Sequence, residues 1–442
     1  MALAMSFTFV ACGDDDNNND EQRKDNQGGI VVPGDDTSTS TMSSIEQKEK
    51  LEKTALDLMA KVKASDFKEL TDLVTYAREN LLSRREYNYN TGGYVQKGLD
   101  DEAINDWFES ALEACQGNLN NGVQKNLYIA ANFKARFVAG NKAWKKEGTS
   151  DGLEFVFDDA KGQKCVLKVT ASDSYTKVHY PEFDSYDYDE RYDEVKLRYE
   201  NTFGIPKEAN VSLTCGSNTL AKVKVTTQLT MKSAEVNLNS DSYTATANVE
   251  VGKYLLVVDK AQFVGDKSAT ASVVLKKEGT SLVTLKAEVA GKLAQETYTK
   301  HDKERVDVSI AEAGKGAVSA DVLGQVQLIG EIKSIDRLVD YMNTAEKNRS
   351  DESACKKAVE NANNELNIGL FFDGKSTRMA SYKFLVSASR KYDTTRYEAV
   401  PAVFFGDGTS YSFEDYFDET YFKKVIQNFE DLVRDFNNLV ED

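Results

Sequence analysis

Aromatic rings and carboxylates alternate in one stretch near the middle of the chain, HYPEFDSYDYDERYDEVKLRYE. Tyrosine rings in such a run can stack on sugar rings, and the carboxylates beside them can accept hydrogen bonds from sugar hydroxyls or bind calcium. A calcium loop of the EF-hand type is excluded, because no glycine occupies its turn position. The candidate ligand-binding residues are Tyr186, Tyr188, Tyr192, Asp187 and Asp189. The competing interpretation, which we favour, is an exposed acidic segment whose tyrosines lie over a sheet.

The residue types that catalysis most often uses form no convincing pattern. A Ser-His-Asp triad would need His179 or His301, and both lie among residues typical of a protein surface. Neither HExxH nor GxGxxG occurs, so zinc-protease and dinucleotide-binding functions lack their usual motifs. The paired carboxylates of a glycoside hydrolase come from distant segments, so spacing does not identify them. We therefore expect no catalytic residue, no cofactor and a non-enzymatic role.

The cysteines beyond the N-terminal region are too far apart for a common metal-binding motif. Cys115, Cys165, Cys215 and Cys355 include no CxxC pair, and the scarcity of histidine leaves few other zinc ligands. We expect no metal site. Cys165 and Cys215 each fall on an expected strand and could form a disulfide, although free, buried thiols are the state that we favour.

The balance of charge limits the possible partners. Lysine and arginine total 55 against 72 acidic residues, which leaves a formal net charge of -17. Binding to nucleic acid or to anionic lipid headgroups depends on clustered basic residues, and the sequence has no basic stripe. We therefore expect no nucleic acid among the partners.

The first residues have the pattern of an export signal. Residues 1–11 carry no charge and are shorter than the ~20 apolar residues of a membrane span, but they match the apolar core of a secretory signal. Small residues flank Cys12, and aspartates follow at positions 14–16. Residues 13–44 contain no aromatic side chain and are strongly acidic, so we expect a disordered tether there.

Beyond the tether the hydrophobic pattern changes twice, which predicts an α+β fold. Apolar residues recur at helical spacing over residues 45–122, which predicts N-terminal helices with Ser65 and Asp66 as candidate caps of the second. Over residues 123–330 the period is two, which predicts a long antiparallel meander of repeated hairpins that begins with NLYIAANFKARFVAG. Residues 331–442 mix helices and strands and end in an amphipathic helix.

One face of the expected sheet carries many small residues, among them Ala245, Ala247, Ala271 and Ala287. A curved sheet lined in this way can leave room for a lipid or another apolar ligand. The alternative, which we favour, is that the small residues let helices such as the C-terminal one pack closely on the sheet.

The stretch from Cys12 to Asp16 resembles the lipidation box and export signal of surface lipoproteins of the Bacteroidetes, in which the cysteine thiol carries a diacylglycerol. Residues 1–12 are then the signal and lipidation site. In its general layout, the rest of the chain is similar to uncharacterised surface lipoproteins of gut Bacteroides-type bacteria. The resemblance implies a cell-surface location on the outer membrane, attachment through a lipid anchor and the capture of glycans or other nutrients. We therefore expect a non-enzymatic binding lipoprotein, with a carrier of a lipid or other apolar ligand as the alternative.

Replacing Cys12 with serine removes the thiol that would be acylated. Each buried CH₂ of an acyl chain contributes ~0.8 kcal/mol, and two or more chains hold a protein stably at a membrane. The Cys12→Ser protein should therefore move from the membrane fraction to the soluble fraction, as measured by fractionation and immunoblotting beside the wild type. An unmodified Cys12 sulfur in the native protein, detected by mass spectrometry, would contradict the anchor.

Overall fold

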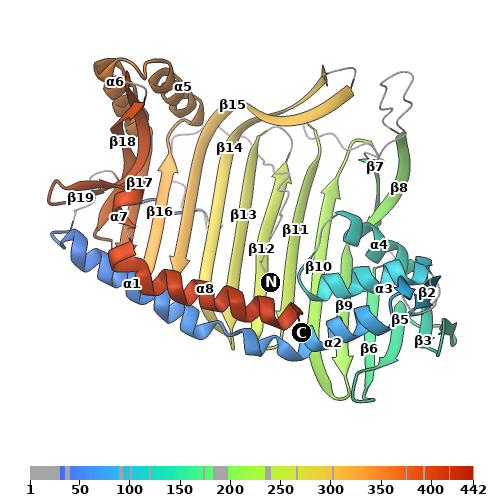
Figure 1. The fold of residues 1–442 in the computed structure, drawn as a ribbon. Coiled ribbons are helices and arrows are strands. Elements are labelled where there is room, and N and C mark those ends of the chain that lie inside the picture. Colours follow the sequence, from blue (N-terminus) through green and yellow to red (C-terminus); the bar gives the residue numbers. More distant parts are fainter. Residues whose placement is uncertain are drawn as a thin grey trace.

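Alternation of apolar and polar residues continues through most of the chain, and in the computed structural model it produces one sheet of sixteen strands (Figure 1). Helices lie at both ends of the chain, so the fold is α+β, as the sequence predicts. The structure describes residues 30–34, 40–88, 93–99, 102–118, 121–172, 175–182, 198–233, 240–264, 267–300, 303–374, 376–391, 394–417 and 419–441.

The helices and strands account for nearly all of these residues. The helices are α1 (Ser44–Lys61), η1, a 3₁₀ turn (Ala64–Asp66), α2 (Lys68–Asn80), α3 (Glu102–Cys115), α4 (Asn121–Asn132), α5 (Ile335–Lys347), α6 (Glu352–Asn364), α7 (Phe413–Tyr416) and α8 (Glu419–Glu441). The first ten strands are β1 (Arg84–Asn88), β2 (Gly93–Lys97), β3 (Ala135–Ala139), β4 (Trp144–Lys146), β5 (Leu153–Asp158), β6 (Lys164–Ala171), β7 (Tyr175–Glu182), β8 (Arg198–Pro206), β9 (Glu208–Cys215) and β10 (Asn218–Thr230). The other ten are β11 (Ser242–Val251), β12 (Tyr254–Val264), β13 (Ser268–Lys277), β14 (Thr280–Lys300), β15 (Lys303–Val322), β16 (Val326–Ile332), β17 (Leu366–Phe372), β18 (Ala380–Lys391), β19 (Thr394–Phe405) and β20 (Ser410–Ser412).

The strands pair almost entirely with their neighbours along the chain. From β9 to β20 every strand is antiparallel to the next, and the order then continues through β6, β5, β3 and β4. The predicted repeated hairpins are present, for example at β5–β6, β9–β10 and β13–β14. One pair, β3 with β5, is parallel, and two short ribbons, β1–β2 and β7–β8, stand apart from the main sheet.

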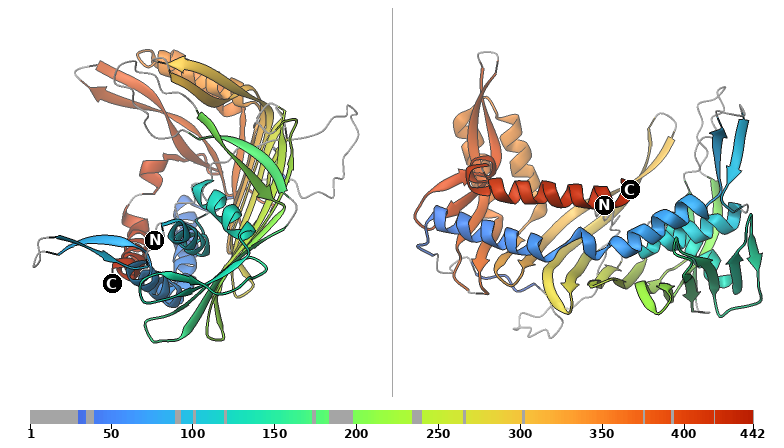
Figure 2. Two further views of the ribbon diagram at one scale, coloured as in Figure 1. Left: turned by 90° about the vertical axis from the view of Figure 1, so that its right-hand side faces the viewer. Right: turned by 60° about the horizontal axis from the view of Figure 1, so that its bottom comes forward.

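The sheet is curved, and the helices lie on its concave side (Figure 2). Helices α3 and α4 cover one end of this side, and α5 and α6 lie over the other end. Between them, α1, η1 and α2 follow one margin of the sheet in succession, with α8 alongside α1 (Figure 1). Helices therefore contact the middle strands only at the strand ends that lie at the bottom of Figure 1.

Buried apolar side chains gather in separate clusters under these helices. The largest lies between α2, α3 and α4 and the strands β3–β6 and β9–β11, and it has Phe108 at its centre. A second cluster joins Ala345, Cys355 and Val359 of α5 and α6 to the strands β18 and β19. A third packs Tyr416 of α7 against β18 and β19. The C-terminal helices thus pack on the sheet, as predicted, although α8 itself packs mainly on α1 and α2.

Two local predictions are wrong. Residues 123–132, expected to begin the strand region, belong instead to helix α4. The apolar residues there, Val123, Leu127, Ala130 and Ala131, recur at three and four residue steps, and all are buried against the sheet. Asp66 does not cap α2, because Phe67 occupies the N-cap position and makes no side-chain hydrogen bond there. The carboxylate of Asp66 contacts the sheet instead.

Removing the Phe108 ring tests the largest cluster. Phe108 is fully buried, and its ring lies 5.0 Å from that of Trp144 and 5.1 Å from that of Phe155. Phe108→Ala should destabilise the protein by about 3–5 kcal/mol, the usual cost of a large buried cavity. Phe133→Ala is the matched control, because Phe133 is 45% exposed. Thermal unfolding compares the two variants, and equal losses would contradict a core centred on Phe108.

Candidate functional site

Two hydrogen bonds to one helix carbonyl identify the side of the sheet that faces the helices. Tyr254 Oη on β12 lies 3.0 Å from Lys61 O, and Lys277 Nζ on β13 donates to the same carbonyl at 2.7 Å. Side chains two positions apart on a strand point to the same face. Tyr254, Lys277 and every second residue from them therefore point to the concave side, with a shift of one position at the bulges in β12 and β14. We call this side of β11–β16 the concave face.

Cross-strand register aligns the apolar residues of the concave face into rows. One row runs through Ala245, Ala261, Ala271, Ala287 and Val318. The next row runs through Ala247, Val258, Val273, Leu285, Ala320 and Leu328. The alanines that the sequence singles out thus lie in these two neighbouring rows, although they come from three different strands.

The concave face is only partly covered. Among the described residues, no helix packs extensively on β11, β12, β13 or β14. Leu285, in the middle of the sheet, is 50% exposed, and Ala287 beside it is exposed as well. The prediction that small residues admit closely packed helices is therefore wrong for this part of the sheet. A connected apolar surface left in this way marks a binding site more often than a scattered exposed leucine does.

The opposite side of the same strands carries most of their charged residues, although a few apolar residues such as Val257 and Val274 also point there. Lys286 follows Leu285 on β14, and Lys276, Glu288 and Asp321 point to this convex side. The two sides of the sheet thus differ in chemistry, and the apolar side is the one turned toward the helices. An antiparallel sheet with one apolar and one polar side normally buries the apolar side.

Helix α1 borders the concave face and is hydrogen bonded to the ends of several strands. Gln47 Nε2 donates to Met379 O at 3.0 Å, near the start of β18. Thr54 Oγ1 donates to Gln325 Oε1 at 3.2 Å, in the turn between β15 and β16. At the far end, α5 approaches the face where Ile335 lies over Gly316 of β15.

A charged cluster, which we call the Asp66 junction, joins the α1–α2 connection to the sheet. Asp66 Oδ2 accepts a hydrogen bond from Lys277 Nζ at 2.6 Å and lies 3.0 Å from Tyr254 Oη. The side chain of Asp66 is only 11% exposed. The hydrogen bond from Lys277 holds the pKa of Asp66 below its usual value, although burial acts in the opposite direction. Phe67 stacks on Tyr254 and contacts Phe436 of α8, so the junction also supports the C-terminal helix.

The structure does not test the predicted tyrosine site. Tyr186, Tyr188, Tyr192, Asp187 and Asp189 lie outside the described residues, between β7 and β8. Cys12 and His301 also lie outside them, so the lipid anchor stays a prediction. His179 falls on β7, opposite Thr202 of β8.

The expected free thiols are wrong for one pair of cysteines. Cys165 and Cys215 face each other on β6 and β9 and form a disulfide with an S–S distance of 2.04 Å. The bridge spans 50 residues, so it restricts the unfolded chain by roughly 4 kcal/mol in the loop-entropy treatment. Sequence spacing could not show this pairing, because β7 and β8 separate the two strands along the chain.

The remaining described cysteines are buried free thiols. Burial raises the pKa of Cys115 to about 12, and burial likewise raises the pKa of Cys355. A thiol acts as a nucleophile only as its thiolate. Neither group is therefore suited to nucleophilic catalysis.

Two stretches have the spacing of known catalytic motifs but the wrong structural context. GTSDG at residues 148–152 has the spacing of a hydrolase nucleophile, yet it is a loop that leads into β5, and Ser150 Oγ contacts Asp151 and Glu154. GLFFDGKS at residues 369–376 has the spacing of a phosphate-binding loop. It continues from β17 into β18, whereas that motif needs a helix directly after the glycines.

No known protein family matches the sequence, and neither a curated protein nor a solved structure matches the chain. None of the helices in the described part of the chain is long and apolar enough to cross a membrane.

The Asp66 junction should make the stability of the protein depend on acid. Because the folded-state pKa of Asp66 is lowered, its contribution is present above the unfolded pKa of about 3.9 and is lost as the pH falls through the folded value. Asp66→Asn should lower the melting temperature at pH 7 and flatten its fall between pH 5 and pH 2.

Asp57→Asn is the matched control for this experiment, because the Asp57–Lys53 pair on α1 is exposed and should contribute little. If Asp66→Asn and Asp57→Asn have the same melting temperature at every pH, the junction does not hold the helices to the sheet.

Proposed function

We propose that this protein is a membrane-anchored, non-enzymatic binding protein that carries an apolar ligand, such as the acyl chain of a lipid, on its concave face. The exposure of Leu285 and Ala287 in the middle of the sheet carries this proposal. A ligand that covers these side chains gains about 25 cal/mol for each Å² of apolar surface removed from water.

The arrangement of small and large residues suits an elongated ligand. The row from Ala245 to Val318 crosses five strands, which at about 4.8 Å per strand spans roughly 19 Å. Short alanine side chains leave room above this row, while Val273 and Leu285 stand higher beside it. An extended alkyl chain lying across the strands would contact both rows along its length.

The course of the N-terminal segment is compatible with a membrane anchor. Asn367 Nδ2 on β17 donates to Pro33 O at 3.0 Å. Asn367 alternates with Leu366 and Ile368, which point to the concave side, so residues 30–34 contact the convex side. The first described residues therefore lie on the side of the sheet opposite the proposed ligand and leave the concave face clear.

Glycan capture by the tyrosine run is the second expectation from the sequence. Its residues lie outside the described part of the chain, so no contact or distance supports it, and we rank it below the carrier. The two functions are compatible, because β7 and β8 stand apart from the concave face.

A charge placed on the concave face should weaken ligand binding. Leu285→Asp puts a carboxylate against the ligand, and the affinity for the fluorescent fatty acid cis-parinaric acid should fall at least about tenfold, which corresponds to 1.4 kcal/mol. Lys286→Asp is the matched control, because this neighbour on β14 points to the convex side. Fluorescence titration measures both variants beside the wild type.

Organic extraction of wild-type protein from its native host should also release an apolar compound that mass spectrometry detects. A wild-type protein that neither binds the fatty acid nor yields such a compound would refute the carrier function. Equal loss of binding in both variants would move the site away from the concave face.

A further inference from the structure

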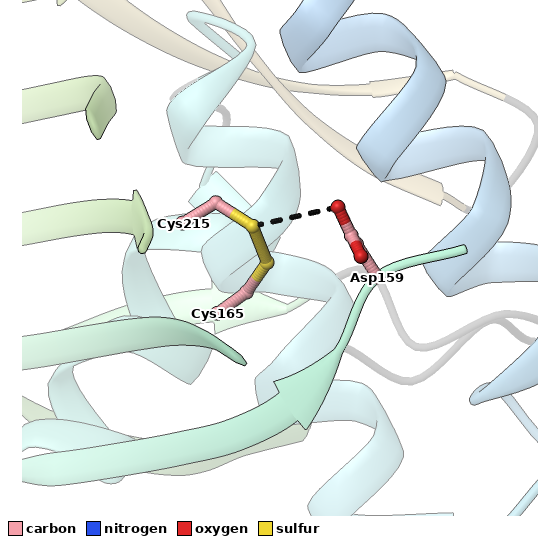
Figure 3. A group of neighbouring side chains, drawn as sticks. All are labelled: Asp159, Cys165 and Cys215. Carbon is pink, nitrogen blue, oxygen red and sulfur yellow. Dashed lines mark hydrogen bonds between the residues drawn. A yellow bond between two sulfur atoms is a disulfide. The ribbon is translucent and has the colours of Figure 1, made fainter. Parts of the chain in front are cut away.

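A carboxylate lies beside the two cysteines of the disulfide. Asp159 Oδ2 lies 3.9 Å from Cys215 Sγ, and the ligand atoms of Asp159, Cys165 and Cys215 all lie within 4.8 Å of one another (Figure 3). We call these three residues the disulfide corner. A bridged sulfur carries no hydrogen, so Cys215 can donate to this carboxylate only after the bridge is reduced.

We propose that the disulfide corner is a redox-controlled site for a thiolate-binding divalent metal ion such as Zn²⁺, held by Cys165 Sγ, Cys215 Sγ and Asp159 Oδ2 once the bridge is opened. Two soft thiolates with one carboxylate suit Zn²⁺, whereas Cu⁺ prefers sulfur alone and Mg²⁺ and Ca²⁺ prefer oxygen. This site is independent of the concave face and of the proposed ligand.

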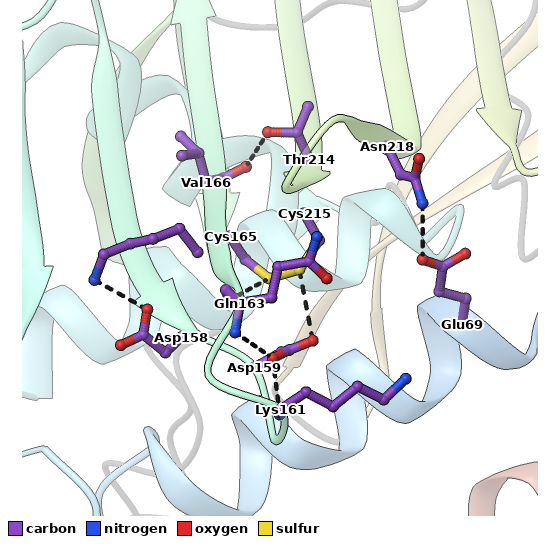
Figure 4. Close-up of a disulfide and its surroundings, with 11 residues drawn as sticks. Glu69, Asp158, Asp159, Lys161, Gln163, Cys165, Val166, Thr214, Cys215 and Asn218 are labelled. Atoms are coloured by element: carbon purple, nitrogen blue, oxygen red, sulfur yellow. Dashed lines mark hydrogen bonds and ion pairs between the residues drawn. A yellow bond between two sulfur atoms is a disulfide. The ribbon is translucent and has the colours of Figure 1, made fainter.

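Two neighbouring hairpin ends hold the three residues in place. Asp159 starts the turn between β5 and β6, Cys165 follows that turn, and Cys215 precedes the turn between β9 and β10 (Figure 4). Strands β6 and β9 are paired along their length, and Gly216 N donates to Lys164 O at 2.8 Å beside the bridge. This backbone ladder keeps the two sulfurs opposite each other whether or not they are bonded.

The carboxylate is already oriented as a ligand. Asp159 Oδ1 accepts hydrogen bonds from Lys161 N at 2.8 Å and from Gln163 N at 2.7 Å, which leaves Oδ2 turned toward Cys215. Hydrogen bonds of this kind orient carboxylate ligands in metal sites. With metal bonds of about 2.3 Å to sulfur and 2.0 Å to oxygen, tetrahedral ligands lie about 3.5 Å apart, close to the present separation of Oδ2 and Cys215.

The turns beside the bridge are exposed to solvent. Cys165 and Cys215 are buried, but Lys161, Gly162 and Gly216 in the adjoining turns are exposed. The three ligands leave one position of a tetrahedron for water or a further ligand. Zn²⁺ would hold the two thiolates about 3.8 Å apart once the bridge is opened.

The chemistry balances with a dithiol as reductant. The dithiol transfers two electrons and two protons to the bridge, its own sulfurs are oxidised to a disulfide, and Cys165 and Cys215 become thiols. Zn²⁺ then displaces both thiol protons, which pass to solvent, and binds the two thiolates. In an oxidising compartment the bridge persists, so the site takes up metal only when reductant reaches it.

Cobalt binding tests the proposal, because Co²⁺ bound to thiolate gives a charge-transfer absorbance that carboxylates alone do not give. All preparations carry Cys12→Ser to remove that thiol, and the full chain is reduced with dithiothreitol, desalted without oxygen and titrated with Co²⁺ and then Zn²⁺. We expect one Co²⁺ per chain in the reduced protein, displaced by one Zn²⁺, and none in the oxidised protein. Circular dichroism checks that the reduced protein keeps its sheet.

Matched variants test the carboxylate ligand and one thiolate ligand separately. Asp159→Asn keeps the Oδ1 acceptor of the turn and should weaken Co²⁺ binding at least about tenfold, the loss that removal of even an outer-shell partner can cause. Asp158→Asn, which breaks the exposed ion pair with Lys164 next to it, should leave binding unchanged. Cys165→Ser retains Cys115 and Cys355 and should abolish the charge-transfer absorbance.

Several results would overturn the proposal. The first is a reduced wild-type protein that shows no thiolate absorbance with Co²⁺. The second is Co²⁺ binding that persists in Cys165→Ser or in the oxidised protein. The third is an equal affinity for Co²⁺ in Asp159→Asn and Asp158→Asn. Loss of the sheet on reduction would also overturn it, because the ladder would then not hold the thiols together.

Discussion

The apolar side of this sheet extends further than the helices that cover it. Sixteen strands lie side by side, whereas α3 and α4 pack at one end, α5 and α6 at the other, and α1 and α8 along one margin. Burial of apolar surface is the main favourable contribution to folding, so the core clusters form where helices meet strands. The middle strands are held mainly by backbone hydrogen bonds to their neighbours. Their apolar side is left with Leu285 half exposed, and this surface is the basis of the proposed function.

Polar contacts determine where α1 lies on this curved surface. Side chains of Gln47, Thr54 and Lys277 connect α1 and η1 to strand ends that are far apart in the sheet. Asp66 and Lys277 are both largely removed from solvent, where the cost of desolvation offsets much of the attraction between their charges. Such pairs contribute to specificity by favouring one position over others. α8 forms a second layer on α1, which explains why Phe429 and Val433 keep 59% and 40% of their surface exposed.

The disulfide corner shows how the same sheet brings distant chemistry together. Cys165 and Cys215 are placed opposite each other because β7 and β8 leave the main sheet and β9 returns to pair with β6. Asp159 joins them because the β5–β6 turn is tight and its carboxylate binds the backbone of that turn. Neither the bridge nor the carboxylate contributes to the concave face, so the two proposed sites are separate.

Local pattern determined the class of the fold and most of its elements. Alternation along β10 and β13 and the helical spacing of α1, α2, α3 and α8 follow from side-chain direction alone, which a sequence displays directly. The failures are equally local in cause. The segment of residues 121–132 is short, and its apolar residues fit either a strand or a helix. It forms a helix because the helical arrangement buries these residues against the sheet. Asp66 has the side chain of a helix cap, yet a lysine from a distant strand provided a stronger partner.

Sequence alone also identified the small residues of one sheet face, and it stated correctly that Ala245, Ala271 and Ala287 share that face. Only the tertiary structure decided whether helices cover these residues, because coverage depends on where α1 and α8 lie. Contacts between residues hundreds of positions apart determine the position of these two helices. The pairing of Cys165 with Cys215 has the same origin. Spacing along a chain fixes the direction of each side chain, but distances between separate segments are set by packing and by the order of strands in the sheet.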